Sequence, residues 1–292
     1  MKVLIIGGSG MLGHKLVQTW QKRFDVRTTL KGKFDDYEKY SIFDKTRVFE
    51  SVDAENFETV ERAISETGPE VIFNAVGIIK QLPTSKNVVK TLTINSIFPH
   101  RLAEASEKFN ARLINISTDC VFDGGRGNYT EEDISNASDV YGKSKNLGEV
   151  SSANCLTLRT SIIGRELQTS HSLVEWFLSN RGKKVKGFVN AIYSGFPTIV
   201  LADIIADLIE SRKDLTGLYH VSSAPINKYE LLNLINDAFH AEVEIEPMPD
   251  FRIDRSLDST KFRRETGFVP QEWREMIKKM AEDPTPYDEW RQ

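Results

Sequence analysis

The sequence predicts an α/β fold: a doubly wound parallel sheet with helices on both faces and a smaller C-terminal lobe. The chain opens with a short, continuously apolar run that glycines end at once. Similar runs then alternate with helix-compatible stretches up to residue 116, and strands that are apolar on both sides are typical of parallel sheets covered by helices. Beyond residue 165 this alternation weakens. We therefore expect one domain over residues 1–165 and a lobe over 166–292, partly interleaved with it.

Composition excludes several classes of partner. The 292 residues carry 38 basic and 42 acidic side chains, a formal net charge of −4, which indicates neither a nucleic acid nor a membrane surface as partner. The apolar run after Lys2 is too short for a signal peptide or a membrane span. Cys120 and Cys155 lack metal-ligand spacing. We expect a cytoplasmic protein without a metal, and a homodimer stays open.

The first strand and its turn predict a site for nucleotide phosphates. The expected strand 2–6 is followed by glycines in G-x-x-G-x-x-G spacing and then by a helix that runs to Trp20. This pattern departs by one residue from the G-x-G-x-x-G fingerprint. Bare glycine backbone lets a pyrophosphate approach the helix N-terminus, where free N–H groups favour negative charge. In this context cofactor binding is favoured over a structural turn. The expected contacts are Gly7, Ser9, Gly10, Met11, Leu12 and Gly13.

The second expected strand, residues 25–30, is basic at its end. In NAD-binding folds an acidic residue near this point holds the ribose 2′-hydroxyl. Here Arg27 lies within the strand, and Lys31 and Lys33 follow it. Because a cationic strand end suits a 2′-phosphate, NADP(H) is preferred and NAD(H) remains open; a solvated charge cluster is the alternative. A helix over 53–66 follows, entered through Asp53, which we add to the cofactor contacts.

Two further expected strands end on small or polar residues. The strand 71–73 runs into Asn74, Ala75 and Val76, over which a cofactor could pass, because ligands lie at the carboxyl ends of parallel strands. The strand 112–116 ends at Ser117 and Thr118, after a long helix over 91–109.

The loop 78–90 that follows Gly77 holds Lys80 and Gln81, two expected substrate contacts. A plain connecting loop is the alternative there.

The central chemical prediction is a proton-transfer set of Thr118, Tyr141 and Lys145. In a helix, positions 141 and 145 lie on one face, at i and i+4. A phenol has a pKa of about 10, and a nearby ammonium favours the phenolate, which brings the acid closer to neutral pH. Tyr141 would donate a proton to a carbonyl oxygen held by Thr118, while Lys145 also holds the nicotinamide ribose. A surface Tyr–Lys pair is the alternative for the pair alone.

We predict that the second half of the chain forms the substrate-binding lobe. We expect helices over 172–180, 200–209, 229–239 and 272–280, with a strand over 218–221. The segment 188–198 reads as strand or loop, and it supplies Asn190 and Ser194 as expected substrate contacts.

These motifs resemble the short-chain dehydrogenase/reductase superfamily in its extended class. The closer resemblance is to the dTDP-4-dehydrorhamnose reductases and related nucleotide-sugar 4-ketoreductases. It extends over nearly the whole chain, in the stretches Ser117–Gly124, Tyr141–Glu149, Leu158–Ser161, Ser194–Thr198 and Ser256–Lys261. The resemblance implies a Rossmann-type fold with a C-terminal nucleotide-sugar lobe. It also implies an oxidoreductase that uses NAD(P)H to reduce the 4-keto group of a nucleotide-activated 6-deoxy sugar, in deoxysugar or surface polysaccharide biosynthesis.

The sequence also departs from that family pattern. Cys120 stands where an aromatic residue often faces the sugar, Ala137 where a proline is usual, and Ile163 where an aromatic residue is common; the segment 78–81 also differs. These departures do not change the predicted reductase chemistry, but they leave open which sugar and which nucleotide the substrate contains. Two alternatives also remain: an epimerase or dehydratase that uses the same Tyr–Lys pair, and a non-catalytic, NADP-binding regulatory subunit.

Overall fold

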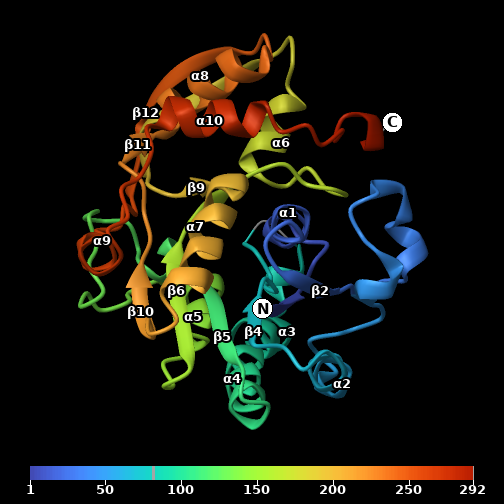
Figure 1. Ribbon diagram of the computed structural model, residues 1–292. Helices are drawn as coiled ribbons and strands as arrows, with labels where there is room; N and C mark the ends of the chain where they lie inside the picture. The colour runs from blue at the N-terminus through green and yellow to red at the C-terminus, as the bar shows by residue number, and fades with distance from the viewer. Residues whose placement is uncertain (81–82, 292) are drawn as a thin grey trace.

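The computed structural model describes residues 1–80 and 83–291. Its centre is a seven-stranded sheet in the order β10-β6-β5-β4-β1-β2-β3, in which every adjacent pair is parallel (Figure 1). The predicted doubly wound parallel sheet is therefore confirmed. The strands are β1 (Lys2–Ile6), β2 (Asp25–Thr29), β3 (Val48–Phe49), β4 (Val71–Asn74), β5 (Arg112–Thr118), β6 (Cys155–Thr160) and β10 (Gly217–His220).

Helices cover both faces of this sheet because strands such as β1 are apolar on both sides. Alternate residues of β1 enter two separate cores. On one face pack α1 (Met11–Trp20) and α7 (Thr198–Ser211), and on the other α2 (Phe57–Thr67) and α4 (Phe98–Lys108) (Figure 1). Period-two alternation thus places one core above the sheet and one below it. Among the described residues, no helix has the length and apolar character that a membrane crossing needs.

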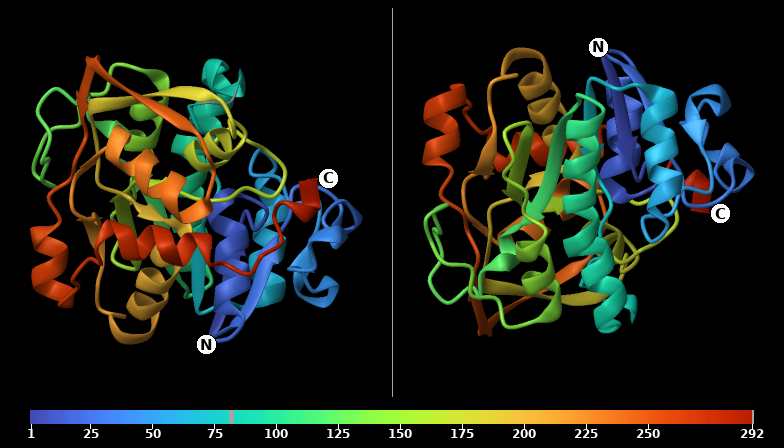
Figure 2. Two further views of the ribbon diagram at one scale, coloured as in Figure 1. Left: turned by 90° about the horizontal axis from the view of Figure 1, so that it is seen from above. Right: turned by 90° about the horizontal axis from the view of Figure 1, so that it is seen from below.

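The later half of the chain contributes both to this sheet and to a smaller lobe. Strand β10 and helix α7 belong to the main sheet although they lie beyond residue 165. The lobe is built on a three-stranded sheet in the order β11-β8-β12 and lies over one end of the main sheet (Figure 2). Its elements are β8 (Lys184–Tyr193), β11 (Ile226–Asn227), β12 (Glu244–Asp254), α8 (Lys228–Phe239) and α10 (Trp273–Ala281). The remaining elements are α6 (Leu173–Leu178), α9 (Thr260–Thr266) and the strand pair β7 (Ile162–Ile163) and β9 (Phe196–Pro197).

Several boundaries differ from the prediction. The helix expected from residue 53 begins at Phe57, because the Asp53 carboxylate accepts a hydrogen bond from the Glu55 backbone and forms a turn instead. The helix expected over 91–109 starts earlier, as α3 (Val88–Leu92), and passes through a π-turn (Thr93–Ile97) before α4. Strands β3 and β12 were not predicted. Most residues of β12 are half-buried or exposed, so it lacks the apolar pattern of a core strand.

The C-terminal tail returns to the beginning of the chain. Figure 2 shows the C-terminus beside the N-terminal elements, and the Trp290 ring lies 5.2 Å from that of Tyr40. His14 in α1 shares a 2.8 Å hydrogen bond with the Tyr287 hydroxyl. The tail therefore packs against the helix that follows the glycine turn.

Candidate active site

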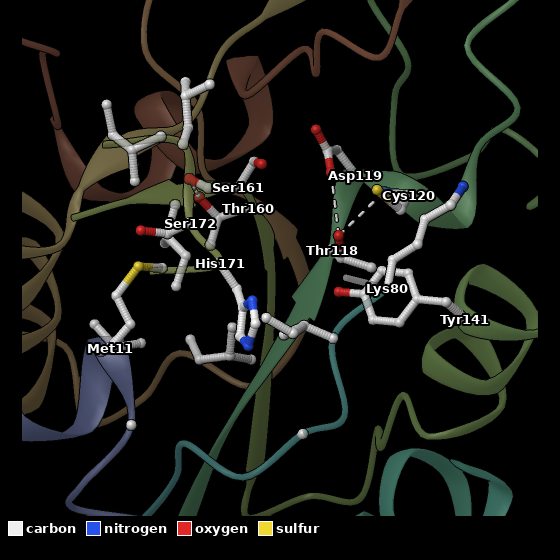
Figure 3. A pocket seen from close by; sticks show the side chains of 18 of the residues that line it. Met11, Lys80, Thr118, Asp119, Cys120, Tyr141, Thr160, Ser161, His171 and Ser172 are labelled. Atoms are coloured by element: carbon white, nitrogen blue, oxygen red, sulfur yellow. Dashed lines mark hydrogen bonds between the residues drawn. The ribbon is translucent and has the colours of Figure 1, made fainter. Parts of the chain in front are cut away.

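A cavity of about 620 Å³ lies between the main sheet and the lobe. It is lined by residues that follow β1 and β4 and by the ends of β5 and β6, which are carboxyl ends of parallel strands. The strand order reverses between β1 and β4, and ligands of open α/β sheets bind at such a switch point. Figure 3 shows Met11 on one side of the cavity and Tyr141 on the other. The volume is of the size that holds small ligands.

The glycine turn forms one end of this cavity. Gly7 adopts a left-handed φ of +91°, and a Cβ atom at Gly13 would collide with the Gly7 carbonyl oxygen. Helix α1 therefore packs directly on the turn. It begins after Gly10 with no side-chain cap and no acidic residue in its first turn, so its first N–H groups are free for an anion. These features fit the phosphates of a dinucleotide. Of the expected contacts, Ser9, Gly10, Met11 and Leu12 line the cavity.

The three predicted catalytic residues lie together in this cavity. Helix α5 (Val140–Leu147) begins at Asp139, whose carboxylate accepts a hydrogen bond from the Gly142 N–H at 2.8 Å. Tyr141 and Lys145 line the cavity with Thr118, the last residue of β5. Figure 3 shows the Tyr141 ring beside Thr118. Tyr141 and Lys145 therefore face the same cavity, as their helical spacing predicted.

Hydrogen bonds fix two of these side chains. Lys145 Nζ donates to the Ile116 carbonyl oxygen at 2.6 Å. Thr118 Oγ1 donates to Asp119 Oδ1 at 3.1 Å and accepts from the Cys120 N–H at 3.1 Å. A hydroxyl has one proton. Thr118 must therefore turn from Asp119 before it can donate to a substrate oxygen.

Burial dominates the electrostatics of the site. It raises the pKa of Tyr141 above its ordinary value. It lowers the pKa of Lys145 to about 8, against the attraction of Glu149. The prediction that Lys145 would bring the phenol pKa toward neutrality is therefore wrong for the protein alone, because burial of Tyr141 disfavours its charged form. Burial also raises the pKa of Cys120 to about 12, so this thiol is neutral.

Two asparagines shape the cavity wall. Asn74 donates to Asn115 Oδ1 at 2.8 Å and accepts from the Val76 N–H, which sets the turn after β4. Asn74, Ala75 and Val76 all line the cavity. Asn95, in the π-turn, accepts from the Ile78 N–H at 2.8 Å. Its amide also donates to the Ser144 hydroxyl in α5 at 3.2 Å. Our sequence analysis missed Asn95 as a positioning residue, since a polar residue within a helix resembles a surface position.

The predicted substrate contacts have different outcomes. Lys80 lines the cavity and pairs with Asp139 at 2.8 Å. Gln81 lies outside the described residues. Asn190 is exposed and donates to the Pro249 carbonyl oxygen, while Ser194 is buried and accepts from the Leu257 N–H; neither lines the cavity.

The residues predicted to choose the cofactor lie apart from the cavity lining. Arg27 is in the middle of β2, paired in register with Leu4. Lys31 is exposed, and its Nζ lies 3.1 Å from Asp53 Oδ2. None of these residues lines the cavity. Their contact with a 2′-phosphate stays a prediction.

The sequence did not mark several residues that close the cavity from the side of the lobe. They follow β6 or come from the lobe, and they include Ser161, Glu166, His171, Ser172, Tyr193, Lys228 and Arg255. Only the tertiary fold brings them to the site.

A parallel sheet with a glycine turn at its switch point and a Thr–Tyr–Lys set beside it defines the extended class of short-chain dehydrogenases/reductases. Within this class, the chain belongs to the family described as the RmlD substrate binding domain, whose model matches residues 1–285.

Relatives and solved structures of this type cover almost the whole chain. A dTDP-4-dehydrorhamnose reductase of Aggregatibacter actinomycetemcomitans is 27% identical, over 95% of this chain and 97% of its own. The spore coat polysaccharide biosynthesis protein SpsK of Bacillus subtilis (strain 168) is 26% identical, over 97% of each. The crystal structure of dTDP-4-dehydrorhamnose reductase from Bacillus anthracis str. Ames in complex with NADP has a TM-score of 0.77 at 24% identity, over 96% of this chain and 98% of that one.

A relative that is named as a subunit of a different enzyme is also similar to this chain. The methionine adenosyltransferase 2 subunit beta of Bos taurus is 25% identical, over 82% of this chain and 72% of its own.

Proposed function

We propose that this chain is an NADP(H)-dependent reductase of the 4-keto group of a nucleotide-linked 6-deoxy sugar, in deoxysugar or surface polysaccharide biosynthesis. The observation that carries the proposal is that Thr118, Tyr141 and Lys145 share one cavity with the uncapped N-terminus of α1. The names of the relatives from Aggregatibacter and Bacillus support the substrate class. The cytoplasm is the proposed compartment, and a homodimer remains a prediction.

The cofactor would lie along the glycine turn and the end of β4. Its phosphates would accept hydrogen bonds from the first N–H groups of α1, and Asn74 to Val76 would line its path. The bound dinucleotide supplies the hydride that reduces the ketone carbon.

The chain itself supplies the proton and holds the oxygen. Tyr141 is neutral at pH 7, because a phenol has an ordinary pKa of about 10 and burial raises that of Tyr141 further. It can therefore donate a proton to the oxygen that becomes the hydroxyl. Thr118 donates a hydrogen bond to the same oxygen once it leaves Asp119. The Lys145 ammonium, held by Ile116, stabilises negative charge on Tyr141 after the proton has left. The dinucleotide cofactor and the ketone would thus meet between β5 and α5.

An internal oxidation and reduction, as in epimerases and dehydratases, is less well supported. A dehydratase needs a further acid and base beside the threonine. Asp119 is close, but the next residue is Cys120, whose raised pKa makes it a poor base near pH 7.

A regulatory subunit is the second candidate, favoured by the subunit name of the Bos taurus relative. The complete Thr118, Tyr141 and Lys145 set argues against a purely structural role.

One assay separates these functions. Purified protein is mixed with NADPH and a panel of 4-keto-6-deoxy sugar nucleotides, and the absorbance of the reduced cofactor is followed. We expect NADPH to be consumed in equal amount to the ketone. Product without net NADPH consumption would instead indicate an epimerase or dehydratase. Tight cofactor binding without any product would indicate the regulatory subunit.

A further inference from the structure

The C-terminal tail, residues 283–291, contacts two walls of the cavity (Figure 2). One wall is the glycine turn with the start of α1, from which Met11 lines the cavity. The other wall is the segment 164–172, which joins β7 to α6 and which we call the wall segment. It forms neither a helix nor a strand of its own, and most of its residues line the cavity. The tail therefore connects two parts of the site that are distant in sequence.

Tyr287 links the tail to the glycine turn through His14. The imidazole of His14 is neutral near pH 7, because burial lowers its pKa to about 3. Its Nδ1 lies 2.8 Å from the Gly10 carbonyl oxygen, which can only accept a hydrogen bond. Nδ1 therefore carries the proton, and Nε2 accepts from the Tyr287 hydroxyl at 2.8 Å. Beside this link, the buried Lys15 ammonium pairs with Asp283. Polar contacts thus fix the tail to α1.

Arg291 links the tail to the wall segment. Its guanidinium pairs with the Glu175 carboxylate in α6. It also donates to the carbonyl oxygens of Glu166 and Thr169, the second at 3.0 Å, and both of these residues line the cavity. Glu175 is 1% exposed and accepts from Arg165 Nε at 2.6 Å as well. Loss of Arg291 therefore leaves the buried carboxylate paired, but it removes a charged donor from two carbonyl oxygens of the cavity wall.

We propose that the tail is a clamp, and that Arg291 is the positioning residue through which it holds the wall segment over a dinucleotide bound at the glycine turn. The proposal rests on the NADP(H) binding of the proposed function. Because the clamp resists outward movement of one wall, it slows dissociation of the dinucleotide more than association. The family model matches residues 1–285, so Tyr287 and Arg291 lie beyond the match. Membership of the family does not by itself account for these two contacts.

The test compares Arg291→Ala with wild type and with Arg212→Ala. Arg212 is a matched control because it also pairs with a carboxylate, that of Asp214, and donates to a carbonyl oxygen, that of Glu265, outside the cavity lining. The two arginine side chains are 25% and 27% exposed. Stopped-flow fluorescence measures the dissociation rate of NADPH. Hydrogen–deuterium exchange of the protein without ligand measures the protection of the wall segment, and the melting temperature checks that each variant is folded.

We expect Arg291→Ala to release NADPH about tenfold faster, the size of effect that loss of a hydrogen bond to a charged group produces. Its association rate stays close to that of wild type. The wall segment exchanges faster, while exchange in the main sheet is unchanged. Arg212→Ala matches wild type in both measurements. Tyr287→Phe, which removes the hydrogen bond to His14 and keeps the ring, should also release NADPH faster.

Wild-type release of NADPH in both Arg291→Ala and Tyr287→Phe would overturn the clamp, even if the wall segment exchanges faster. Faster release without a change in exchange of the wall segment would overturn the role of Arg291 as its positioning residue. The proposed function fails in a different way. A wild type that binds NADPH and releases it faster without Arg291, but reduces no ketone, would reject the reductase and keep the clamp. A wild type that binds neither NADPH nor NADH would reject both.

Discussion

Lys145 donates a 2.6 Å hydrogen bond to the carbonyl oxygen of Ile116, two residues before Thr118 in the same strand. This bond ties helix α5 to the end of β5, so the tyrosine and the threonine of the site are held by one contact. It also keeps a buried ammonium near the phenol. The reductase account depends on this arrangement.

The first prediction concerns alkaline pH. Burial lowers the pKa of Lys145 to about 8, so its ammonium is lost as pH rises through that value. We expect kcat/KM to fall above pH 8, measured as a pH–rate profile. Lys228 has the same lowered pKa of about 8 and also faces the cavity. The Lys228→Met variant keeps the alkaline fall if Lys145 causes it. A profile that is flat from pH 7 to 10 would contradict this role of Lys145.

The second prediction concerns cofactor choice. Lys31 is exposed beyond the end of β2, and its ion pair with Asp53 is exposed to solvent. Such a pair is weak enough to give way to a 2′-phosphate. We expect Lys31→Ala to weaken NADPH binding up to about tenfold, or 1.4 kcal/mol, and to leave NADH binding unchanged in fluorescence titrations. Lys184→Ala, which removes an exposed pair with Glu244 in the lobe, is the matched control. A wild type that uses NADH far better than NADPH would refute the cationic strand end as the basis of selection.

The third prediction concerns a buried ion pair beneath the site. Arg159 contacts both carboxylate oxygens of Glu149 at 2.7 Å, and the Ser117 hydroxyl donates to the same carboxylate at 2.6 Å. Removal of one charge leaves the other buried and unpaired, so Glu149→Gln should lower the free energy of unfolding by about 3–5 kcal/mol. Urea unfolding measures this loss. Glu244→Gln, at the exposed pair with Lys184, should cost less than about 1 kcal/mol. Equal losses in both variants would be the contrary result.

The fourth prediction concerns acid stability. His14 is buried between the Gly10 carbonyl oxygen and the Tyr287 hydroxyl, and burial lowers its pKa from 6.5 to about 3. Between these values the unfolded chain binds a proton that the folded protein does not, so the stability falls as pH drops from 6.5 toward 3. We expect His14→Gln to flatten the dependence of the melting temperature on pH in this window. As a control, His171→Gln at an exposed histidine should leave the pH dependence of the melting temperature unchanged. The same unchanged dependence in His14→Gln would contradict the role of His14.

Local sequence patterns were sufficient to predict those parts of the site that lie within a single strand, turn or helix. The apolar run before Gly7 predicted a central strand and a phosphate turn, because period and glycine spacing are properties of a single segment. The helical spacing of Tyr141 and Lys145 placed both in one cavity with Thr118. The polar end of β4 at Asn74 followed from the geometry of parallel sheets.

The remaining parts depend on contacts between distant segments. Arg255 lies beside Tyr193 only because β12 pairs with β8 in that register, and Lys228 reaches the same ring from the first turn of α8. Asn190 and Ser194 lie outside the cavity lining while Tyr193 lines it, and the sequence analysis did not assign the faces of β8. The pKa of Tyr141 could not be predicted either, since desolvation depends on the whole fold around the phenol.

The turnover of Tyr141→Phe is the measurement that tests the central claim most directly. The substitution removes one hydroxyl from the cavity and leaves Lys145 and the glycine turn in place. With NADPH and a 4-keto-6-deoxy sugar nucleotide, we expect kcat to fall by roughly 10²–10⁴, the range of a general acid, while NADPH affinity stays close to that of wild type. Undiminished turnover in this variant would contradict the role of Tyr141 as the proton donor.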